Sequence, residues 1–130
     1  MAIRQTIEAH FNTNWSKTAI AWDNVDFDPK GRQEFVRFSY QDNIGSQMSL
    51  GGVGNRLFRH SGFIFIQVLV RRGAATKRVD ELADDALNIF EGNEILGLRF
   101  INCTKKSVTG IEKEWFQVNV VCEFSRDIIK

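Results

Sequence analysis

The stretch that decides the fold is residues 58–70, Phe-Arg-His-Ser-Gly-Phe-Ile-Phe-Ile-Gln-Val-Leu-Val. In a β-strand, successive side chains point to opposite faces. In this stretch both faces are apolar. One face carries Phe63, Phe65 and Leu69, and the other carries Ile64, Ile66, Val68 and Val70. In an antiparallel sheet one face commonly meets water. We therefore expect a central strand that is covered on both faces, by helices on one side and by another subunit on the other.

Two helices are predicted, one on each side of this strand in the sequence. Over residues 2–15 the apolar side chains recur at steps of four, which places them on one helical face. They are Ile3, Ile7, Phe11 and Trp15. A second helix is predicted from about Thr76 to Phe90, with Gly92 where a C-terminal cap is expected. Each helix has one apolar side to bury against a sheet.

The remaining strands are predicted at residues 34–40, 98–104 and 115–124, where apolar and polar side chains alternate. A shorter apolar piece at residues 20–22 precedes a dense turn signal. This order predicts an α+β fold, a mostly antiparallel sheet of four to five strands with two helices packed on one face. A length of 130 residues suits a single domain over residues 1–130.

Residues 41 to about 57 form the longest segment without clear periodicity, although residues 47–50 suit a short strand. Glycines occupy positions 45, 51, 52 and 54. A structureless connection of this length is unusual in a compact domain. We therefore expect this segment to be functional or to be ordered by a partner.

The two cysteines are too few for a disulfide framework. If the last two strands form a hairpin centred near Thr109, Cys103 and Cys122 face positions about five residues apart, or roughly 16 Å along the strand. A disulfide needs Cα atoms within about 7 Å. We therefore predict that both cysteines are buried small hydrophobic residues that do not pair.

No pattern for catalysis, a cofactor or a metal stands out. Residues 52–54, Gly-Val-Gly, lack the third glycine and the following helix of a dinucleotide loop. The calcium-like spacing of residues 24–28 is followed by Pro29 where such a loop needs glycine, which favours a turn. His10 and His60 each lack a second ligand at helical or hairpin spacing, so solvated or capping roles are expected. We predict no enzyme activity and no cofactor.

The composition predicts a soluble globular protein, with 43% hydrophobic residues, eleven Phe and a single Pro. No apolar run approaches the length of about 18 residues that a membrane span needs. The N-terminal residues lack the continuous apolar stretch of a secretory signal. We therefore expect no membrane partner and a cytoplasmic location.

The formal net charge of +1, from 17 Lys and Arg against 16 Asp and Glu, argues against a protein dedicated to gripping nucleic acid. The charges are nevertheless segregated. Between Asp42 and Asp80 there is no acid, and the bases are Arg56, Arg59, Arg71, Arg72, Lys77 and Arg78. The next fifteen residues hold no base, and the acids are Asp80, Glu81, Asp84, Asp85, Glu91 and Glu94.

Three interpretations of this segregation stay open. The charged residues are solvated faces, or the basic edge of one subunit meets the acidic helix of the next in a ring, or the arginines face a passing phosphate backbone. The candidate residues for a subunit interface or a lumen are Arg56, Arg59, Arg71, Arg72, Asp80, Asp84 and Asp85.

Five short segments also form a pattern through their order and their spacing along the chain. They are residues 20–24 with Phe27 and Pro29, residues 35–38, Arg59-His60-Ser61-Gly62 leading into residues 63–68, residues 81–84 through Ile89-Phe90, and residues 115–120. In these segments the chain resembles the tail terminator-like proteins of long-tailed (siphovirus-type) bacteriophages, from about Ile3 to Phe124. It departs from that pattern at Arg71-Arg72, where a less basic strand end is expected.

The resemblance implies a virion structural protein that forms a hexameric ring on the head-proximal end of the tail tube. There it stops tube polymerisation and offers the head–tail joining surface. The implied partners are further copies of the chain, the tail tube protein and the head connector or completion protein, with DNA passing through the lumen without specific binding. The implied location is the virion tail, after assembly in the host cytoplasm, and the family has no catalytic residues to carry over.

Two alternatives remain at this stage. One is another head–tail joining or tail completion protein. The other is a nonspecific nucleic-acid-binding module that uses the arginines, which predicts tight duplex binding with a steep salt dependence.

Overall fold

The computed structural model describes residues 3–23, 25–42, 46–71, 76–108 and 115–129. Two helices and seven strands follow one another along the chain. They are α1 (Ile3–Asn14), β1 (Ala19–Trp22), β2 (Glu34–Asp42), β3 (Ser46–Gln47), β4 (Leu57–Arg71), α2 (Thr76–Phe90), β5 (Glu94–Ile95), β6 (Leu98–Val108) and β7 (Trp115–Ile129).

The strands form one mixed sheet in the order β1-β2-β4-β7-β6-β5, and β3 adds to it by pairing with β4. All pairs are antiparallel except β1 and β2, which run parallel with Ala19 opposite Phe35. The predicted antiparallel character is therefore largely confirmed, but the predicted number of four to five strands is wrong. The short strand suggested at residues 47–50 is found as β3, at Ser46–Gln47, whereas β5 was missed because a strand of two residues is too short to show a period. A parallel pair needs a crossover connection and cannot be joined by a tight turn, and the connection between β1 and β2 is residues 23–33.

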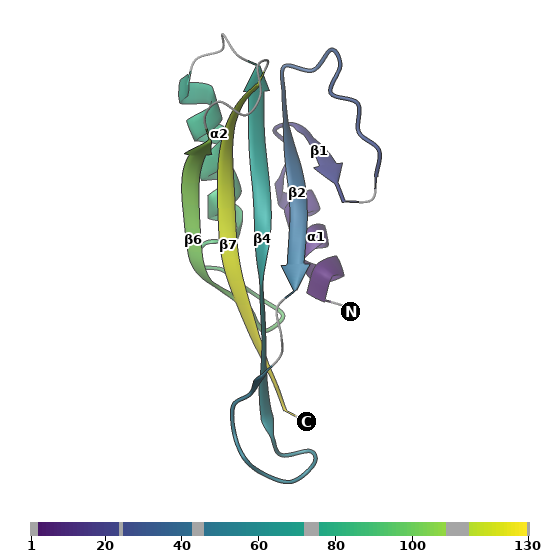
Figure 1. Ribbon diagram of the computed structural model, residues 1–130, viewed down its shortest axis with the longest axis vertical. Helices are drawn as coiled ribbons and strands as arrows, with labels where there is room; N and C mark the ends of the chain where they lie inside the picture. Colours follow the sequence, from purple (N-terminus) through teal and green to yellow (C-terminus); the bar gives the residue numbers. More distant parts are fainter. Residues whose placement is uncertain (1–2, 24, 43–45, 72–75, 109–114, 130) are drawn as a thin grey trace.

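Both helices pack on the same face of the sheet, as predicted (Figure 1). Ile7 and Phe11 of α1 and Leu82 and Phe90 of α2 are fully buried. The ring of Phe11 joins the layers, since its centroid lies 5.1 Å from that of Phe38 on β2 and 6.0 Å from that of Phe90. The core is thus an aromatic cluster between the helices and the sheet.

β4 is a central strand, as predicted, with β2 on one side and β7 on the other. Its helix-side residues, Ile64, Ile66, Val68 and Val70, are buried. On the opposite, open face Leu69 is buried in a second cluster with Phe35 and Trp115. Phe63 and Phe65 on that face are half-buried, with ring centroids 6.3 Å apart. That another subunit covers the open face stays a prediction.

β4 and β7 continue past the helices as a narrow extension, which we call the distal arm (Figure 1). The distal arm comprises residues 46–61 and 125–129, and its two strands remain paired up to Leu57 opposite Ile129. Gly62 lies at the junction between the arm and the helix-covered body. A Cβ atom at Gly62 would lie 2.6 Å from the ring of Phe124 and would also collide with the carbonyl oxygen of Gln41. Only glycine therefore fits at this junction without a local shift.

The register of β6 against β7 contains an irregularity between Phe100 and Asn102. Phe100 lies opposite Phe124, but Asn102 lies opposite Glu123, so one extra residue, Ile101, is accommodated in β6. This β-bulge places Cys103 directly opposite Cys122. The prediction that the two cysteines are far apart is therefore wrong, because the hairpin is not centred near Thr109.

Candidate assembly surfaces

The predicted basic residues lie at the two ends of β4 and do not form one edge. Arg56 and Arg59 belong to the distal arm, whereas Arg71 is the last residue of the strand. Arg59 and Arg71 are therefore about 40 Å apart along the strand. Arg72 lies outside the described residues. The block of arginines in the sequence thus corresponds to two separate places in the fold.

Arg59 pairs with a carboxylate of its own chain. Its Nε and Nη2 atoms donate to the two carboxylate oxygens of Asp127, at 2.8 and 3.2 Å, because the two residues are directly opposite in the β4–β7 ladder. Arg99 on β6 donates to the same carboxylate at 3.1 Å. The hydrogen bonds from Arg59, with the added charge of Arg99, hold the pKa of Asp127 below its usual value. Arg99 and Asp127 were not predicted, since nothing in the sequence links these three positions.

A depression of about 350 Å³ lies on the open face beside this cluster. It is lined by Arg59, Ser61, Arg99, Ile101, Glu123 and Ser125. Ser125 is 3% exposed, and its hydroxyl oxygen has no hydrogen-bond partner among the described residues. The carboxylates of Asp127 and Glu123 already balance the charges of Arg59 and Arg99. The depression therefore suits a polar protein surface better than a free anion.

Arg56 and Arg71 both lie against aromatic rings. The guanidinium carbon of Arg71 is 4.4 Å from the ring centroid of Trp115, and its Nε donates to the carbonyl oxygen of Arg32 at 3.1 Å. The guanidinium carbon of Arg56 is 5.6 Å from the ring centroid of Phe58. The buried Nε of Arg56 has no acceptor within the described part of the chain. Arg71 is therefore held by its own chain, whereas Arg56 retains an unused donor.

The acidic residues of α2 are partly balanced by lysines from other elements. Asp84 pairs with Lys105 of β6 at 2.8 Å, and Asp85 pairs with Lys17 at 3.4 Å. The hydrogen bond that Lys105 donates to Asp84, with the charge of Asp80 nearby, raises the pKa of Lys105. Asp80 is exposed and forms no ion pair with a described residue. Exposed ion pairs contribute little to stability, so all three carboxylates remain available to a partner.

Arg78, part of the predicted basic block, serves the fold. It donates to both carboxylate oxygens of Glu34, at 2.9 and 2.7 Å, and so ties the first turn of α2 to the start of β2. These hydrogen bonds hold the pKa of Glu34 below its usual value. The acid-free stretch of sequence therefore overstates the basic charge that is free for a partner.

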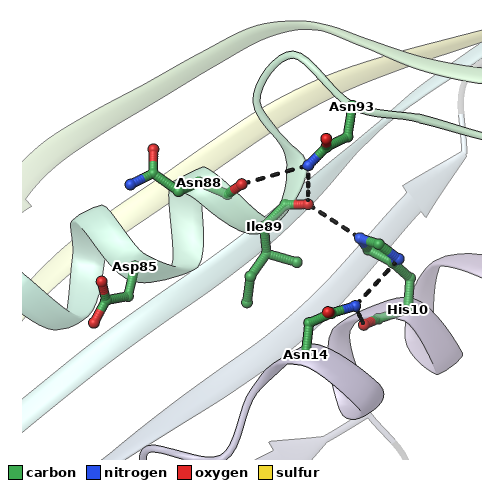
Figure 2. Close-up of a pocket in the computed structure, with 6 residues that line it drawn as sticks. All are labelled: His10, Asn14, Asp85, Asn88, Ile89 and Asn93. Atoms are coloured by element: carbon green, nitrogen blue, oxygen red, sulfur yellow. Dashed lines mark hydrogen bonds between the residues drawn. The ribbon is translucent and has the colours of Figure 1, made fainter.

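A polar pocket of about 400 Å³ lies between the two helices, lined by His10, Asn14, Asp85, Asn88, Ile89 and Asn93 (Figure 2). His10 on α1 reaches across to the carbonyl oxygen of Ile89 near the end of α2, with its Nε2 3.1 Å away. A carbonyl only accepts, so Nε2 donates, and Nδ1 is free to accept from the Asn14 amide at 3.4 Å. Asn93 donates to the same carbonyl at 2.7 Å. Of the solvated or capping roles expected for His10, the structure shows the capping one, and the hydrogen bonds in this pocket join α1 to the end of α2.

The tip of the distal arm exposes a group of large apolar side chains. Leu50 is 95% exposed and Val53 87%, and Met48 and Ile129 nearby are also exposed. Scattered exposed apolar residues are ordinary, whereas contiguous exposed apolar patches are typical of interaction sites. The sequence predicted that this segment is functional or is ordered by a partner, from its length, its glycines and its lack of periodicity.

Within the described residues, neither helix is long and apolar enough to cross a membrane. No three His, Cys, Asp or Glu side chains gather there in a way that could hold a metal ion.

Comparison with known proteins identifies the family. The sequence pattern of the family described as "Phage tail terminator protein" matches residues 2–120. The chain therefore belongs to the phage tail terminator protein family, which gives it a structural role in the phage tail and confirms the resemblance seen in the sequence.

Among the solved structures that resemble this chain, one has a TM-score of 0.66 at 15% sequence identity, over 100% of this chain and 99% of the other. At this identity the likeness shows the fold alone. A comparison with curated proteins finds no match.

Proposed function

We propose that this protein forms a ring, with six subunits, on the head-proximal end of the tail tube. The ring stops tube polymerisation and provides the surface to which the head connector binds. The observation that carries this proposal is the family match over residues 2–120. Its partners are other copies of the chain, the tail tube protein and the head connector, with DNA passing through the lumen.

The distal arm supports a contact between subunits. In the described chain, the three buried side-chain polar atoms without a partner are Arg56 Nε, His60 Nε2 and Ser125 Oγ, and all three belong to the arm. Leaving such an atom unpaired costs about 1–3 kcal/mol, which a hydrogen bond from a partner offsets. The exposed apolar tip adds surface that a partner would remove from water. The arm is thus the part of the subunit with most to gain from assembly.

The subunit contact that we propose places the arm of one copy against α2 of the next. Arg56 and Arg59 then face Asp80, Asp84 and Asp85 of the neighbouring copy. This is a head-to-tail contact between two different surfaces, the kind that closes into a ring. Arg71 lies at the other end of β4 and belongs in this scheme to a second surface, toward a neighbour or the lumen.

The experiment that tests the function is removal of the protein during phage assembly. We expect tails of abnormal length that do not join heads. Tails of normal length that join heads would contradict the proposal. Tails of normal length that fail to join heads would indicate the alternative, a joining or completion protein, because only loss of a terminator leaves tube growth unchecked.

The proposed subunit contact is tested by charge reversal. The double variant R56E/R59E should lower the fraction of hexamer seen by native mass spectrometry in the presence of tail tube ends. Adding D80K/D84K in the same chain should restore part of it, because the charges again have opposite signs. R71E/R72E probes the second surface, where we also expect weaker ring formation. Unchanged oligomers in all three variants would contradict the charge-paired contact.

A further inference from the structure

Cys103 and Cys122 form a directly opposed pair across the antiparallel β6–β7 ladder. Directly opposed residues in such a ladder have Cα atoms about 4.5–5.5 Å apart. This separation falls within the range of about 4.4–6.8 Å that disulfides span. The backbone therefore already holds the two cysteines at bonding distance, without movement of either strand.

The bulge at Ile101 creates this arrangement. Before the bulge, Phe100 opposes Phe124, and the same register continued would place Cys103 opposite Val121. A one-residue shift also moves a side chain to the other face of a sheet. The extra residue thus brings Cys103 to the helix-covered face, where it packs against the same core as Cys122. The one inserted residue therefore sets both which residue Cys103 opposes and which face of the sheet it occupies.

The two thiols differ in access. Cys122 is fully buried, whereas Cys103 is half-buried on the strand nearer the sheet edge. Hydrogen bonding between the two thiols lowers the pKa of Cys103 and, together with burial, raises the pKa of Cys122. Cys103 is thus the thiol that an external reagent can reach and the one that more readily becomes the thiolate nucleophile.

We propose that Cys103 and Cys122 are a covalent modification site, a dithiol that a small disulfide such as oxidised glutathione converts to a cross-strand disulfide. The Cys103 thiolate attacks one sulfur of the reagent, breaks its S–S bond and releases one glutathione thiol. Cys122 then loses its proton and attacks the Cys103 sulfur, which releases the second glutathione. The two protein thiols lose two protons and two electrons, and the reagent takes up both.

The redox state of Cys103 and Cys122 would depend on whether the phage particle is inside or outside the host cell. Disulfides are rare in a reducing cytoplasm and persist outside cells. Under this proposal the pair is a dithiol in the host and becomes a disulfide after release, where it joins β6 to β7 covalently. The chemistry does not depend on ring formation, so its failure would leave the proposed function intact.

The test uses the folded full-length protein, incubated with oxidised glutathione and analysed by intact mass and peptide mapping. The wild type should lose both free thiols, retain no glutathione and give a peptide that links residues 103 and 122. C122S should retain one glutathione on Cys103, because no second thiol releases it. C103S should remain unmodified while folded, because Cys122 is buried.

Two outcomes would overturn the proposal. One is a wild type that accumulates a stable glutathione adduct at Cys103 while Cys122 stays a free thiol. The other is a folded wild type in which both thiols stay reduced under conditions that oxidise the same chain in denaturant. Circular dichroism checks that each serine variant is folded. If a variant is not folded, the result for the wild type still decides whether the proposal stands.

Discussion

The helix-covered body and the distal arm are built on the same two strands, β4 and β7, yet their side chains differ in exposure to solvent. In the body, Ile64, Ile66 and Val68 are buried beneath the helices. In the arm, Leu50 and Val53 are almost fully exposed. The buried polar atoms without partners also lie in the arm, as far as the structure is described. The body thus buries its helix-facing core within one chain, whereas the arm exposes apolar side chains and holds buried polar atoms without a partner among the described residues.

This difference predicts that residues of the body and residues of the arm contribute to different properties of the protein. A residue of the body contributes to the free energy of unfolding of the single chain. A residue of the arm tip contributes little to that free energy and, under our proposal, contributes to assembly. Substitutions in the two regions should therefore change different measurements.

The largest effect is expected from Phe11→Ala in the body. Phe11 is fully buried and its ring meets those of Trp15, Phe38 and Phe90. Truncation should lower the free energy of unfolding by about 3–5 kcal/mol, because it removes apolar contacts and leaves a cavity. Urea denaturation measures this loss. Leu50→Ala is the matched control in the arm, with an expected change within about 0.5 kcal/mol, and similar losses in both variants would refute the comparison.

Gly62→Val tests the junction between the two regions. The added side chain would collide with the Phe124 ring and with the Gln41 backbone, so we expect a loss of about 1–3 kcal/mol in thermal or urea unfolding. Gly52→Ala is the control, because a Cβ atom at Gly52 meets nothing within 4 Å. Equal stability of both variants would mean that the junction adapts without cost.

A smaller, pH-dependent effect is expected from Glu34→Gln in the body. The pKa of Glu34 is lowered in the folded state by its hydrogen bonds to Arg78. Its contribution is therefore present above the unfolded pKa and is lost as the pH falls through the lower folded pKa. Because Arg78 is partly exposed, E34Q should cost less than about 1 kcal/mol at neutral pH.

The difference between wild type and E34Q should shrink as the pH falls below about 4, as measured by urea denaturation over a pH series. Glu81→Gln is the control, because its ion pairs with Lys77 and Arg78 are long, at 3.9 and 4.0 Å. A stability difference for E34Q that does not change with pH would show that the charge of Glu34 is not its source.

The smallest effect on stability is expected at the arm tip. The double variant L50S/V53S should unfold within about 0.5 kcal/mol of the wild type, because both side chains are already in water. It should nevertheless lower the fraction of protein that joins tail tube ends, measured by cosedimentation with purified tubes. Full incorporation of this variant would show that the apolar tip is not an assembly contact.

Local patterns in the sequence predicted the elements well. The helix from Thr76 to Phe90 is found with the expected bounds, and β4 is the central strand that its two apolar faces indicate. These features follow from periodicity within a few residues. The direction of β1 was not predictable in this way, because alternation indicates a strand but not whether its neighbour runs parallel.

Relations between distant residues were not predictable. The opposition of Cys103 and Cys122 depends on one bulged residue and on the length of the connection between β6 and β7, neither of which has a local signature here. Arg56 and Arg59 lie far from Arg71 in the fold because β4 is long, so one block of charge in the sequence corresponds to two separate places. The pairs of Arg59 with Asp127 and of Asp84 with Lys105 join strands and helices that only the fold brings together.

The unbroken pairing of β4 with β7 has a mechanical consequence. Their ladder runs from Leu57 opposite Ile129 to Arg71 opposite Trp115 without a shift in register. Hydrogen bonds in an antiparallel ladder lie perpendicular to the strands. A pull on the arm tip along the strand direction would thus load all of these bonds together in shear, and would not open them one at a time. Force applied at the tip is carried directly into the core of the body, so a subunit anchored by its arm would bear tension as a stiff rod.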